Sequence, residues 1–553
     1  MKKIGFALLF VLISSVHIFA CTSILVGKNA SIDGSTMITY AADSYAVHGD
    51  LYYWPIAEYP KNTVMEMYDW ETTQYLGPIK QVPATNNVVG YINEYQLSLG
   101  ETTFGGRKEL VDSTGIMDYG NLIFLALQRA KTAREAIKVM TDLVEEYGYF
   151  SSGESFSIAD KNEIWIMEMI GKGVGRKGAV WVAVRIPDDC IAAHANQARI
   201  HQFPLNDPEN CIYSKDVISF AREMGYYKGA DKDFSFANAY SPLAWSKLRF
   251  CEARVWSIFN KFGEGDANKW LPYILGEDPT PMPLYIKPKQ KVSVKDIMDM
   301  MRDQYANTPF DPTKDIGAGA YGSPYRFNPL SFEFEGKKYG FERPIATQQT
   351  AFSFVSQMRD YLPDEIGGVL WFGTDDANCS VYTPMYGSIT QVPECYREGN
   401  GDLITFSWTS AFWIHNWVAN MIYPRYDQLL PDLRAAQNEL EGDFLTSQAA
   451  KEKEFAELLK IDRNKAIEQI TNYSLETAER TMTRWKSLGE YLIVKSIDGV
   501  IKKEEIDQNG EKRFKRSIHG LYERPDRPQL NEKILRAIIQ EKGDWLEQKE
   551  IKR

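Results

Sequence analysis

Hydrophobic and polar residues alternate along the first part of the chain in a way that predicts β-strands. Residues 21–27 and 35–44 form two apolar runs, and the polar turn between them contains Asp33-Gly34, a dipeptide typical of tight hairpin turns. We therefore predict a strand hairpin here. The same pattern predicts a strand pair over 86–103 and further strands over 154–160, 163–171, 179–186 and 190–200.

A helical period interrupts these strands. Thr132 and Glu135 fit the spacing of a capping box, in which each side chain binds the backbone of the other residue. Strands that alternate with helical segments predict an α+β architecture in which helices cover sheets. The apolar side chains on one face of the predicted helix are Ala136, Ile137, Met140, Leu143 and Val144.

The remainder of the chain changes character twice. Residues 207–307 are more helical and aromatic, whereas 308–413 place short strands among many Pro and Gly turns, with 367–375 the clearest buried strand. After residue 423 the sequence becomes helical and charged. We interpret 449–470 as one helix with a solvated face and not as a charged binding site.

A glycine-rich segment, Gly171–Gly178, predicts a hairpin turn. A loop that binds a dinucleotide needs a strand before it and a helix after it. Strand-like runs lie on both sides of this segment, so its glycines do not indicate a cofactor site.

The first twenty residues have the features of a secretory signal peptide. A positive start at Lys2 and Lys3 precedes a mostly apolar run, and Ala20 is a small residue at the expected cleavage site. The run is too short for a transmembrane helix, and no later segment reaches that length without charges or turn residues. We predict a signal peptide over 1–20 and an exported chain, periplasmic or extracellular, that begins at Cys21.

A lipoprotein signal is the alternative, because it also ends directly before a cysteine. Phe19 does not suit that pattern, in which small residues are usual beside the modified cysteine. Lipoproteins also commonly carry a flexible polar tether after the lipid, whereas Cys21 leads straight into a strand-like segment. Lipid anchoring at Cys21 therefore stays open but disfavoured.

Amino-acid composition and net charge argue against some classes of function. The chain has 553 residues, 44% of them hydrophobic and 25% charged, which is ordinary for a globular protein. Its net charge of −11 disfavours nucleic acid and anionic membrane surfaces as partners. The cysteines other than Cys21 are odd in number, so at least one stays unpaired or bridges to another molecule, although Cys379 and Cys395 could pair. The scattered histidines show no metal-ligand spacing, so we expect neither metal nor cofactor.

A cysteine that begins a mature chain carries its own base. The reference pKa of a thiol is about 8.5 and that of an α-amine about 7.7–8.0, so the amine of Cys21 would accept the thiol proton near neutral pH. One residue would then supply both nucleophile and general base. A lipid on that amine would remove its basicity, so the lipoprotein and catalytic interpretations exclude each other. The alternative for Cys21 is a small buried residue at the start of a strand.

Several separated blocks of the sequence carry a resemblance to known proteins, namely residues 21–38, 92–103, 193–200, 249–256, 306–313, 341–363, 367–386 and 409–417. In the same order, these blocks resemble the C69 family of dipeptidases (also called U34), members of the N-terminal-nucleophile hydrolases. The resemblance implies an αββα sandwich and the hydrolysis of dipeptides through a thioester on Cys21. We assign the hydrolase domain to 21–425 and a helical, charged C-terminal region, where the resemblance is weakest, to 426–553.

The same resemblance implies roles for three further residues. Asp43 matches an aspartate that hydrogen-bonds near the amine or thiol of the nucleophile, and Asn196 matches an asparagine whose amide N–H would stabilise the oxyanion. Arg254 is the candidate for the active-site arginine, with Arg249 as a rival. Together with Cys21 these residues form the predicted catalytic set. Without the resemblance, Asp43 is equally a turn or cap residue, and Asn196 a loop residue bonded to backbone.

Two positions depart from the family pattern. Tyr40 stands where an arginine is usual, and a phenol does not supply that positive charge, which leaves open how the thiolate and a substrate carboxylate are held. Thr103 falls near the position at which related acylases use an oxyanion asparagine, and the nearby Asn93 belongs to the strand motif. We include neither Tyr40 nor Asn93 in the catalytic set.

The leading hypothesis is an exported cysteine dipeptidase with dipeptides as substrates. The first alternative is an amidase of the same superfamily that acts on N-acyl amino acids, bile-salt conjugates or penicillin V, although such enzymes are usually much shorter. The second alternative is a lipid-anchored surface protein that binds peptides without chemistry. The side-chain preference, the oligomeric state and the physiological role stay open.

Overall fold

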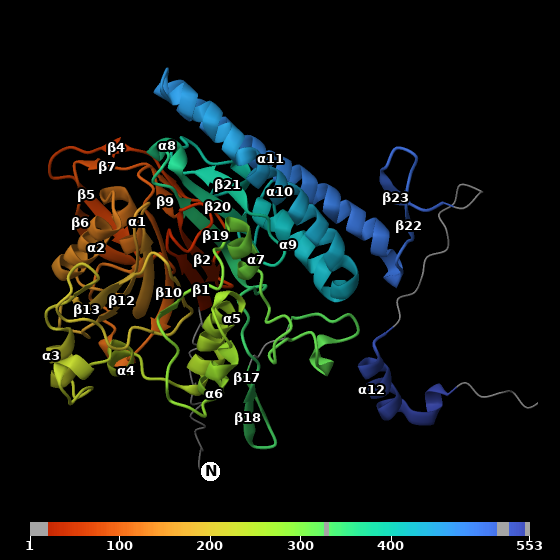
Figure 1. Cartoon of the computed structure of the whole chain (residues 1–553), viewed down its shortest axis with the longest axis horizontal. Coiled ribbons are helices and arrows are strands. Elements are labelled where there is room, and N and C mark those ends of the chain that lie inside the picture. Colours follow the sequence, from red (N-terminus) through yellow and green to blue (C-terminus); the bar gives the residue numbers. More distant parts are fainter. Residues whose placement is uncertain (1–19, 326–330, 517–529, 548–553) are drawn as a thin grey trace, which may run out of the picture.

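Two antiparallel sheets pack face to face at the centre of the protein (Figure 1). The computed structural model describes residues 20–325, 331–516 and 530–547, so the predicted signal peptide, apart from Ala20, lies outside the described residues. The first sheet contains, in spatial order, β16 (Tyr285–Ile286), β14 (Ile191–His194), β1 (Ala20–Val26), β2 (Thr36–Asp43), β19 (Thr350–Met358), β20 (Gly368–Thr374) and β21 (Thr383–Tyr386). The second contains β15 (Cys211–Tyr213), β13 (Ala179–Ile186), β12 (Ile164–Gly171), β11 (Gly153–Ala159), β10 (Ser98–Gly105), β9 (Ile92–Asn93), β8 (Val88–Val89) and β3 (Tyr53–Trp54).

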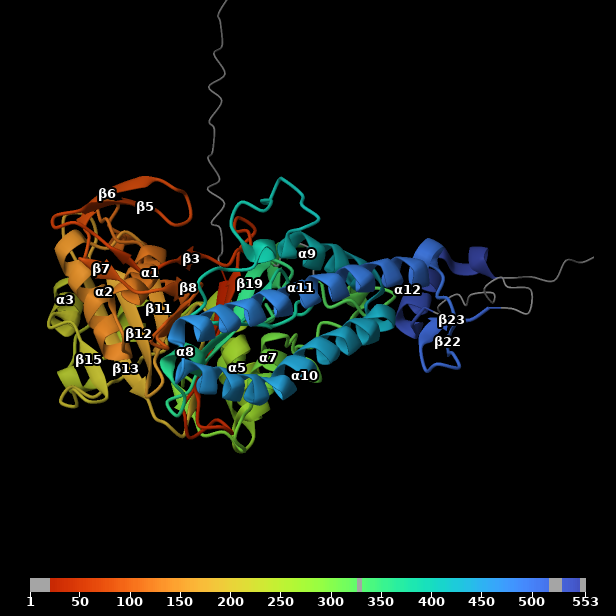
Figure 2. The same ribbon diagram turned by 90° about the horizontal axis from the view of Figure 1, so that it is seen from above.

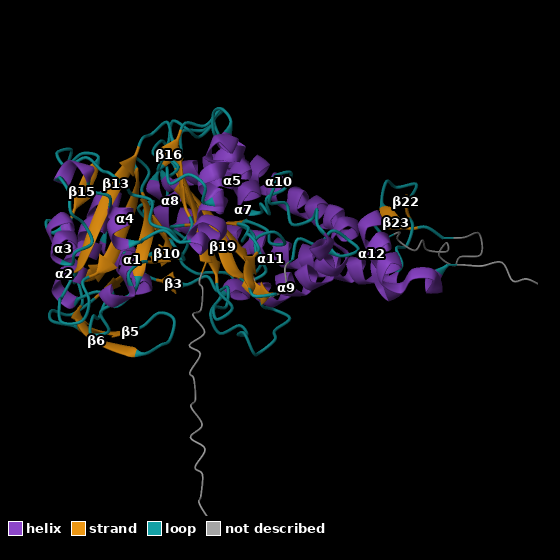
Figure 3. Ribbon diagram, turned by 90° about the horizontal axis from the view of Figure 1, so that it is seen from below, coloured by secondary structure: helices purple, strands orange, loops and turns teal. Residues whose placement is uncertain are grey.

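Helices cover the outer face of each sheet, which confirms the α+β class and the αββα sandwich (Figure 3). The second sheet is covered by α1 (Tyr119–Arg129) and α2 (Ala133–Tyr147). The first sheet is covered by α5 (Ala253–Phe262), α7 (Val294–Met301), α9 (Ala411–Ile422) and α11 (Arg463–Ser496).

Most strands predicted from the hydrophobic pattern are present, but the strand predicted over 190–200 ends at His194, and the pair predicted over 86–103 consists of the short β8 and β9 followed by β10. β1 and β2 pair antiparallel, and every residue of β2 is buried. A strand covered on both faces loses the apolar–polar alternation of a half-exposed strand, which explains the nearly continuous apolar runs at 21–27 and 35–44. The glycines at Gly171–Gly178 join β12 to β13 as a hairpin, as the sequence predicts.

A buried histidine connects the two sheets. His194, at the end of β14, lies with Nδ1 2.7 Å from Thr102 Oγ1 of β10 and Nε2 2.7 Å from Ser157 Oγ of β11. Burial lowers the pKa of His194 to about 3, because the charged form loses its hydration there. The neutral ring thus holds the first sheet against two strands of the second.

Helix α2 begins where the sequence predicts, with one difference in its cap. The Thr132 side chain accepts from the backbone N–H of Glu135, as in a capping box. The Glu135 carboxylate, however, accepts from the backbone N–H of Lys131, one residue before the cap. The predicted apolar face, from Ala136 to Val144, is buried against the second sheet.

Two long antiparallel helices, α10 (Tyr426–Leu459) and α11, run along one side of the sandwich (Figure 2). The single helix predicted over 449–470 is wrong, because the chain turns between these two helices. Asp462 starts α11 by accepting from the backbone N–H of Lys465, a typical N-cap contact. The C-terminal region also contains a β-hairpin, β22 (Glu504–Ile506) and β23 (Lys512–Phe514), so it is not entirely helical.

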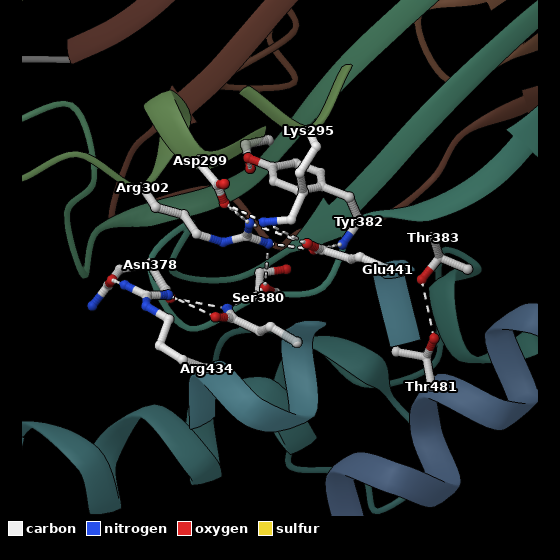
Figure 4. A network of polar contacts seen from close by, with 12 residues as sticks. Lys295, Asp299, Arg302, Asn378, Ser380, Tyr382, Thr383, Arg434, Glu441 and Thr481 are labelled. Atoms are coloured by element: carbon white, nitrogen blue, oxygen red, sulfur yellow. Dashed lines mark hydrogen bonds and ion pairs between the residues drawn. The ribbon is translucent and has the colours of Figure 1, made fainter. Parts of the chain in front are cut away.

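Buried ion pairs attach α10 to the sandwich (Figure 4). Glu441 of α10 accepts from the guanidinium of Arg302, at the end of α7, and from the backbone N–H of Tyr382. About three turns further along α10, Glu452 accepts from both Nη atoms of Arg359 at 2.7 Å. These carboxylates fix the position of α10 over β21.

The remaining elements are short and lie around this framework. Among the described residues, no helix is long and apolar enough to span a membrane. All six cysteines have free thiols, so the Cys379–Cys395 pairing that the sequence allowed is not formed. The short strands are β4 (Ala57–Glu58), β5 (Val64–Tyr68), β6 (Tyr75–Lys80), β7 (Ala84–Thr85), β17 (Ser331–Phe334) and β18 (Lys337–Gly340). The short helices are α3 (Val217–Glu223), α4 (Phe236–Tyr240), α6 (Leu271–Leu275), α8 (Asp364–Gly367) and α12 (Glu532–Lys542).

Candidate active site

Cys21 lies near the start of β1, buried between the two sheets with 4% of its surface exposed. Its nitrogen, here part of the Ala20–Cys21 peptide bond, donates to Asn196 Oδ1 at 2.8 Å. Its Sγ lies 3.7 Å from Glu101 Oε1 and 3.9 Å from the hydroxyl of Tyr40. The thiol is thus surrounded by polar groups inside an otherwise apolar core.

Asn196 follows β14 in a left-handed backbone conformation, with φ of 62°, which asparagine tolerates better than most residues. Its Oδ1 accepts from the nitrogen of Cys21 and from Arg254 Nη2, each at 2.8 Å, and its Nδ2 donates to the carbonyl of Thr103 at 2.9 Å. These partners fix which way the amide points. An amide nitrogen carries two hydrogens, so one N–H remains for a further acceptor.

Arg254 binds the carbonyl side of Cys21, opposite the nitrogen held by Asn196. Arg254 is the second residue of α5 and is fully buried. Its Nη1 donates to the carbonyl of Cys21 at 2.6 Å and to Thr22 Oγ1 at 2.7 Å. The rival, Arg249, pairs instead with Glu342. The structure therefore brings Arg254, and not Arg249, to Cys21 and Asn196.

Asp43 ends β2, directly beside the start of β1. Its Oδ1 accepts from Thr350 Oγ1 at 2.6 Å, and its Oδ2 lies 3.8 Å from Arg343 Nη2. Burial raises the pKa of Asp43 to about 6, against the opposing effect of Arg343. The Asp43 backbone N–H also interacts with the thiol of Cys21, so Asp43 contacts this thiol through its main chain.

Two carboxyl groups that the sequence analysis missed lie beside the thiol. Glu101 of β10 accepts from the Tyr40 hydroxyl at 2.5 Å. Glu154 of β11 pairs in register with Thr103, two residues after Glu101, so both carboxyls lie on the same face of the sheet. The sequence contained one signal for each of these residues, because each is the single acidic residue of its strand, at 98–105 and 153–159.

Thr103 and Asn93, the two residues considered near the oxyanion position, lie in different parts of the structure. Thr103 lines the cavity beside Cys21. Asn93 lies away from it and donates to the carbonyls of Leu127 and Ala130 at the end of α1. Asn93 therefore caps the C-terminal end of α1. Arg343, by contrast, was not singled out, although it lies within the block 341–363.

A small, largely aromatic cavity adjoins the thiol. Burial raises the pKa of the Cys21 thiol well above its usual value, and the nearby carboxyls of Glu101 and Asp43 raise it further. The sulfur therefore stays protonated until a base takes its proton. The side chains lining the cavity are Cys21, Tyr40, Ala42, Asp43, Ser44, Val47, Trp70, Tyr91, Glu101, Thr103, Tyr119 and Phe352.

Comparisons with known proteins place the chain among peptidases. A model of peptidase family C69 matches residues 20–439. A probable dipeptidase of Latilactobacillus sakei is 27% identical over 435 residues, covering 74% of this chain and 82% of the relative. A probable dipeptidase of Salmonella dublin is 29% identical over 405 residues, covering 70% and 84%. A probable dipeptidase B of Streptococcus pyogenes serotype M1 is 24% identical over 521 residues, covering 89% and 97%.

Proposed function

This chain belongs to peptidase family C69, and on that basis we propose that it is a dipeptidase whose nucleophile is the thiol of Cys21. The observation that carries the proposal is the way Asn196 and Arg254 hold the main chain of Cys21 on both sides of its side chain. The thiol is left facing the aromatic cavity. Relatives named probable dipeptidases support dipeptides as the substrates.

The reaction requires removal of residues 1–20, so that the nitrogen of Cys21 becomes a free amine. We propose that this amine, held by Asn196 Oδ1, takes the thiol proton as Sγ attacks the scissile carbonyl carbon. The carbonyl oxygen becomes an oxyanion, and the remaining Asn196 N–H is the donor for it. The ammonium then gives its proton to the leaving amine as the C–N bond breaks. A thioester remains, and water hydrolyses it to restore the thiol.

Charges near the thiol support this sequence of proton transfers. The raised pKa of the thiol means that it ionises only when a base is close, which the α-amine provides. Once the amine is protonated, the carboxylate of Asp43 stabilises it, and the buried guanidinium of Arg254 offsets the negative charge on sulfur. The positive charge absent at Tyr40 is thus supplied from Arg254 and from Arg343.

Export is part of the same proposal, because a secretory peptidase would create the free amine of Cys21. The amidase alternative keeps one supporting observation, since the aromatic side chains beside the thiol would also pack against an acyl group. A lipid-anchored binding protein would have no free amine at Cys21. The mass of the mature N-terminus separates a free cysteine from a lipidated one.

The decisive experiment measures dipeptide hydrolysis by the chain that begins at a free Cys21 and by its Cys21→Ser variant. A serine hydroxyl is a far weaker acid than a thiol, so we expect a loss of at least about a hundredfold, roughly 2.7 kcal/mol of barrier. Cys395→Ser, which changes a distant thiol, is the matched control and should keep full activity.

A folded precursor with an uncleavable extension before Cys21 should be inactive, because an amide nitrogen is not a base. Circular dichroism confirms folding of each variant. If Cys21→Ser or the extended precursor cleaves dipeptides at nearly the wild-type rate, the proposed mechanism is wrong.

A further inference from the structure

The carboxyl pair of Glu101 and Glu154 has bonding capacity that the protein leaves unused. Glu101 Oε2 and Glu154 Oε2 are both buried, and neither has a hydrogen-bond donor in standard geometry among the described residues. A proton shared between the two carboxyls fills only part of this capacity, because each carboxyl oxygen has two lone pairs. Leaving buried polar atoms unpaired is costly, and native proteins seldom do so without a reason. The pair lies beside the nucleophile, where a substrate would supply the missing partner.

Distances identify which part of a substrate would meet Glu101. At the moment of attack the scissile carbonyl carbon lies about 3–3.5 Å from the sulfur. In an amino acid the α-nitrogen lies about 2.5 Å from the carbonyl carbon, as bond lengths and angles require. Glu101 Oε1 lies 3.7 Å from Cys21 Sγ. An orientation of the substrate therefore exists in which the carbonyl carbon is in position for attack and the α-nitrogen of the residue being transferred lies within hydrogen-bond reach of Glu101.

The surroundings favour a positive charge at that position. Rings of Tyr91, Tyr119, Trp70 and Phe352 line the cavity together with Glu101. Aromatic faces attract cations, and a carboxylate among them forms a site for an ammonium group. An uncharged acyl group would leave the carboxylate desolvated and unpaired.

The charge of the carboxyl pair also fits one ammonium. Burial raises the pKa of Glu101, and it raises the pKa of Glu154 well above its usual value, with further repulsion from Glu101. Two buried carboxyls in contact hold one proton between them. The pair then carries one net negative charge, which a single α-ammonium neutralises.

We propose that Glu101, supported by Glu154, binds the α-ammonium of the N-terminal residue of the substrate and so makes a free amino group a requirement of this enzyme. Glu101 contacts the substrate, whereas Glu154 positions Glu101. This inference rests on the proposed dipeptidase function and adds to it the feature by which free dipeptides are distinguished from N-acyl amino acids.

The first test uses the wild-type protein that begins at a free Cys21. It compares kcat/KM for alanyl-alanine with that for its des-amino analogue, propionyl-alanine, and for N-acetyl-alanyl-alanine. A site that has to hydrogen-bond a substrate amine rejects the analogue that lacks it, so we expect a preference of at least about a hundredfold for the free dipeptide. Equal rates for dipeptide and des-amino analogue would overturn the inference while leaving the peptidase proposal intact. A protein that cleaves none of the three contradicts the proposed function itself, and the inference with it.

The second test uses Glu101→Gln, with Glu146→Gln, an exposed acid on α2, as the matched control. We expect Glu101→Gln to lower the preference for the free dipeptide at least about tenfold, chiefly through kcat/KM for that substrate, with little change for propionyl-alanine. Glu154→Gln should lower it less. Thermal unfolding verifies that the variants fold, and the wild-type comparison stands even if one does not.

A separate readout distinguishes substrate binding from proton abstraction by Glu101. Iodoacetamide alkylates the thiol of Cys21 without any ammonium group. If Glu101 serves the substrate, alkylation in Glu101→Gln is unchanged or faster, because a charge that raises the pKa of the thiol is gone. Slower alkylation, with dipeptide and des-amino rates lowered equally, would make Glu101 a base for the thiol and overturn the assignment.

Discussion

At the scale of single residues, side chains of opposite charge are buried around one thiol, that of Cys21. Arg254 and Arg343 lie near the main chain of β1 and β2, whereas Glu101 and Glu154 belong to the second sheet. Each charge loses hydration on burial and depends on its neighbours instead. The ionisation of each group should therefore change when a neighbour is replaced, and Asp43 offers the clearest test.

Asp43 should determine the lower part of the acid limb of the pH profile. Its pKa is about 6 in the chain that retains Ala20, and a mature ammonium at Cys21 would favour its charged form further. Because the charged carboxylate is the useful form, Asp43 should add a rise in kcat/KM up to about pH 6, below the separate rise that accompanies deprotonation of the α-amine near its usual pKa of about 7.7–8.0. Asp43→Asn should remove the lower rise and lower the plateau by less than Cys21→Ser does. Steady-state rates between pH 4 and 9 measure it, and an unchanged acid limb in the variant would exclude Asp43 as its source.

Part of the site could be found from the sequence, and part could not. Cys21, Asp43, Asn196 and Arg254 lie within recognisable local segments, and the structure brings all four together. The contact between Glu101 and Glu154 depends on the register of β10 against β11, which no local pattern records.

At the scale of elements, the ion pairs of α10 should differ in strength according to burial. Glu441→Ala would leave the Arg302 guanidinium and the Tyr382 N–H without their acceptor in the core, a loss expected to cost about 3–5 kcal/mol. Asp443→Ala removes an exposed pair with Arg480 on the same helix hairpin and should cost less than about 1 kcal/mol. Equilibrium denaturation of both variants measures the difference. Equal losses of stability would contradict the expectation that the buried Arg302–Glu441 pair (Figure 4) contributes more than the exposed pair.

His194 should make the protein less stable in acid. Its pKa is about 3 in the folded state against about 6.5 in an unfolded chain, so between these values the unfolded chain binds more protons. Stability therefore falls as pH falls through this window, by on the order of 1 kcal/mol per pH unit. His194→Gln should be less stable at pH 7 but show a shallower decline from pH 6 to 4. Melting temperatures across that range test this, and parallel slopes would exclude His194.

Elements differ in how well the sequence predicted them. The α2 helix carries its own start signal at Thr132, and β1 and β2 are apolar throughout, so local patterns suffice. The turn between α10 and α11 escaped prediction because hydrophobic periodicity continues across it, and only the N-cap of Asp462 marks the new helix. Periodicity reports which face is buried but not where a helix stops.

At the scale of the whole molecule, α10 and α11 belong to the folding unit even though the family match ends at residue 439. A chain that ends there loses Phe444 of α10 and Trp485 of α11, both buried in the core. We expect it to be insoluble or unfolded. A chain that ends at Gly499 keeps both helices and should fold and retain activity, because α12 has no buried residues. Soluble yield and melting temperature compare the two, and a stable chain ending at 439 would show that the helices are dispensable.

The pairing of Ala20 with Asp43 at the very start of β1 has a consequence for the proposed removal of residues 1–20. A leader peptidase needs several residues around its target bond in an open, extended form. After folding, the bond between Ala20 and Cys21 lies inside the sheet ladder, so we expect the refolded precursor to resist a leader peptidase that cuts the unfolded chain, as mass spectrometry would reveal. Under the proposed mechanism, cleavage and folding therefore compete, and we expect a molecule that folds first to keep its extension and to lack the free amine of Cys21.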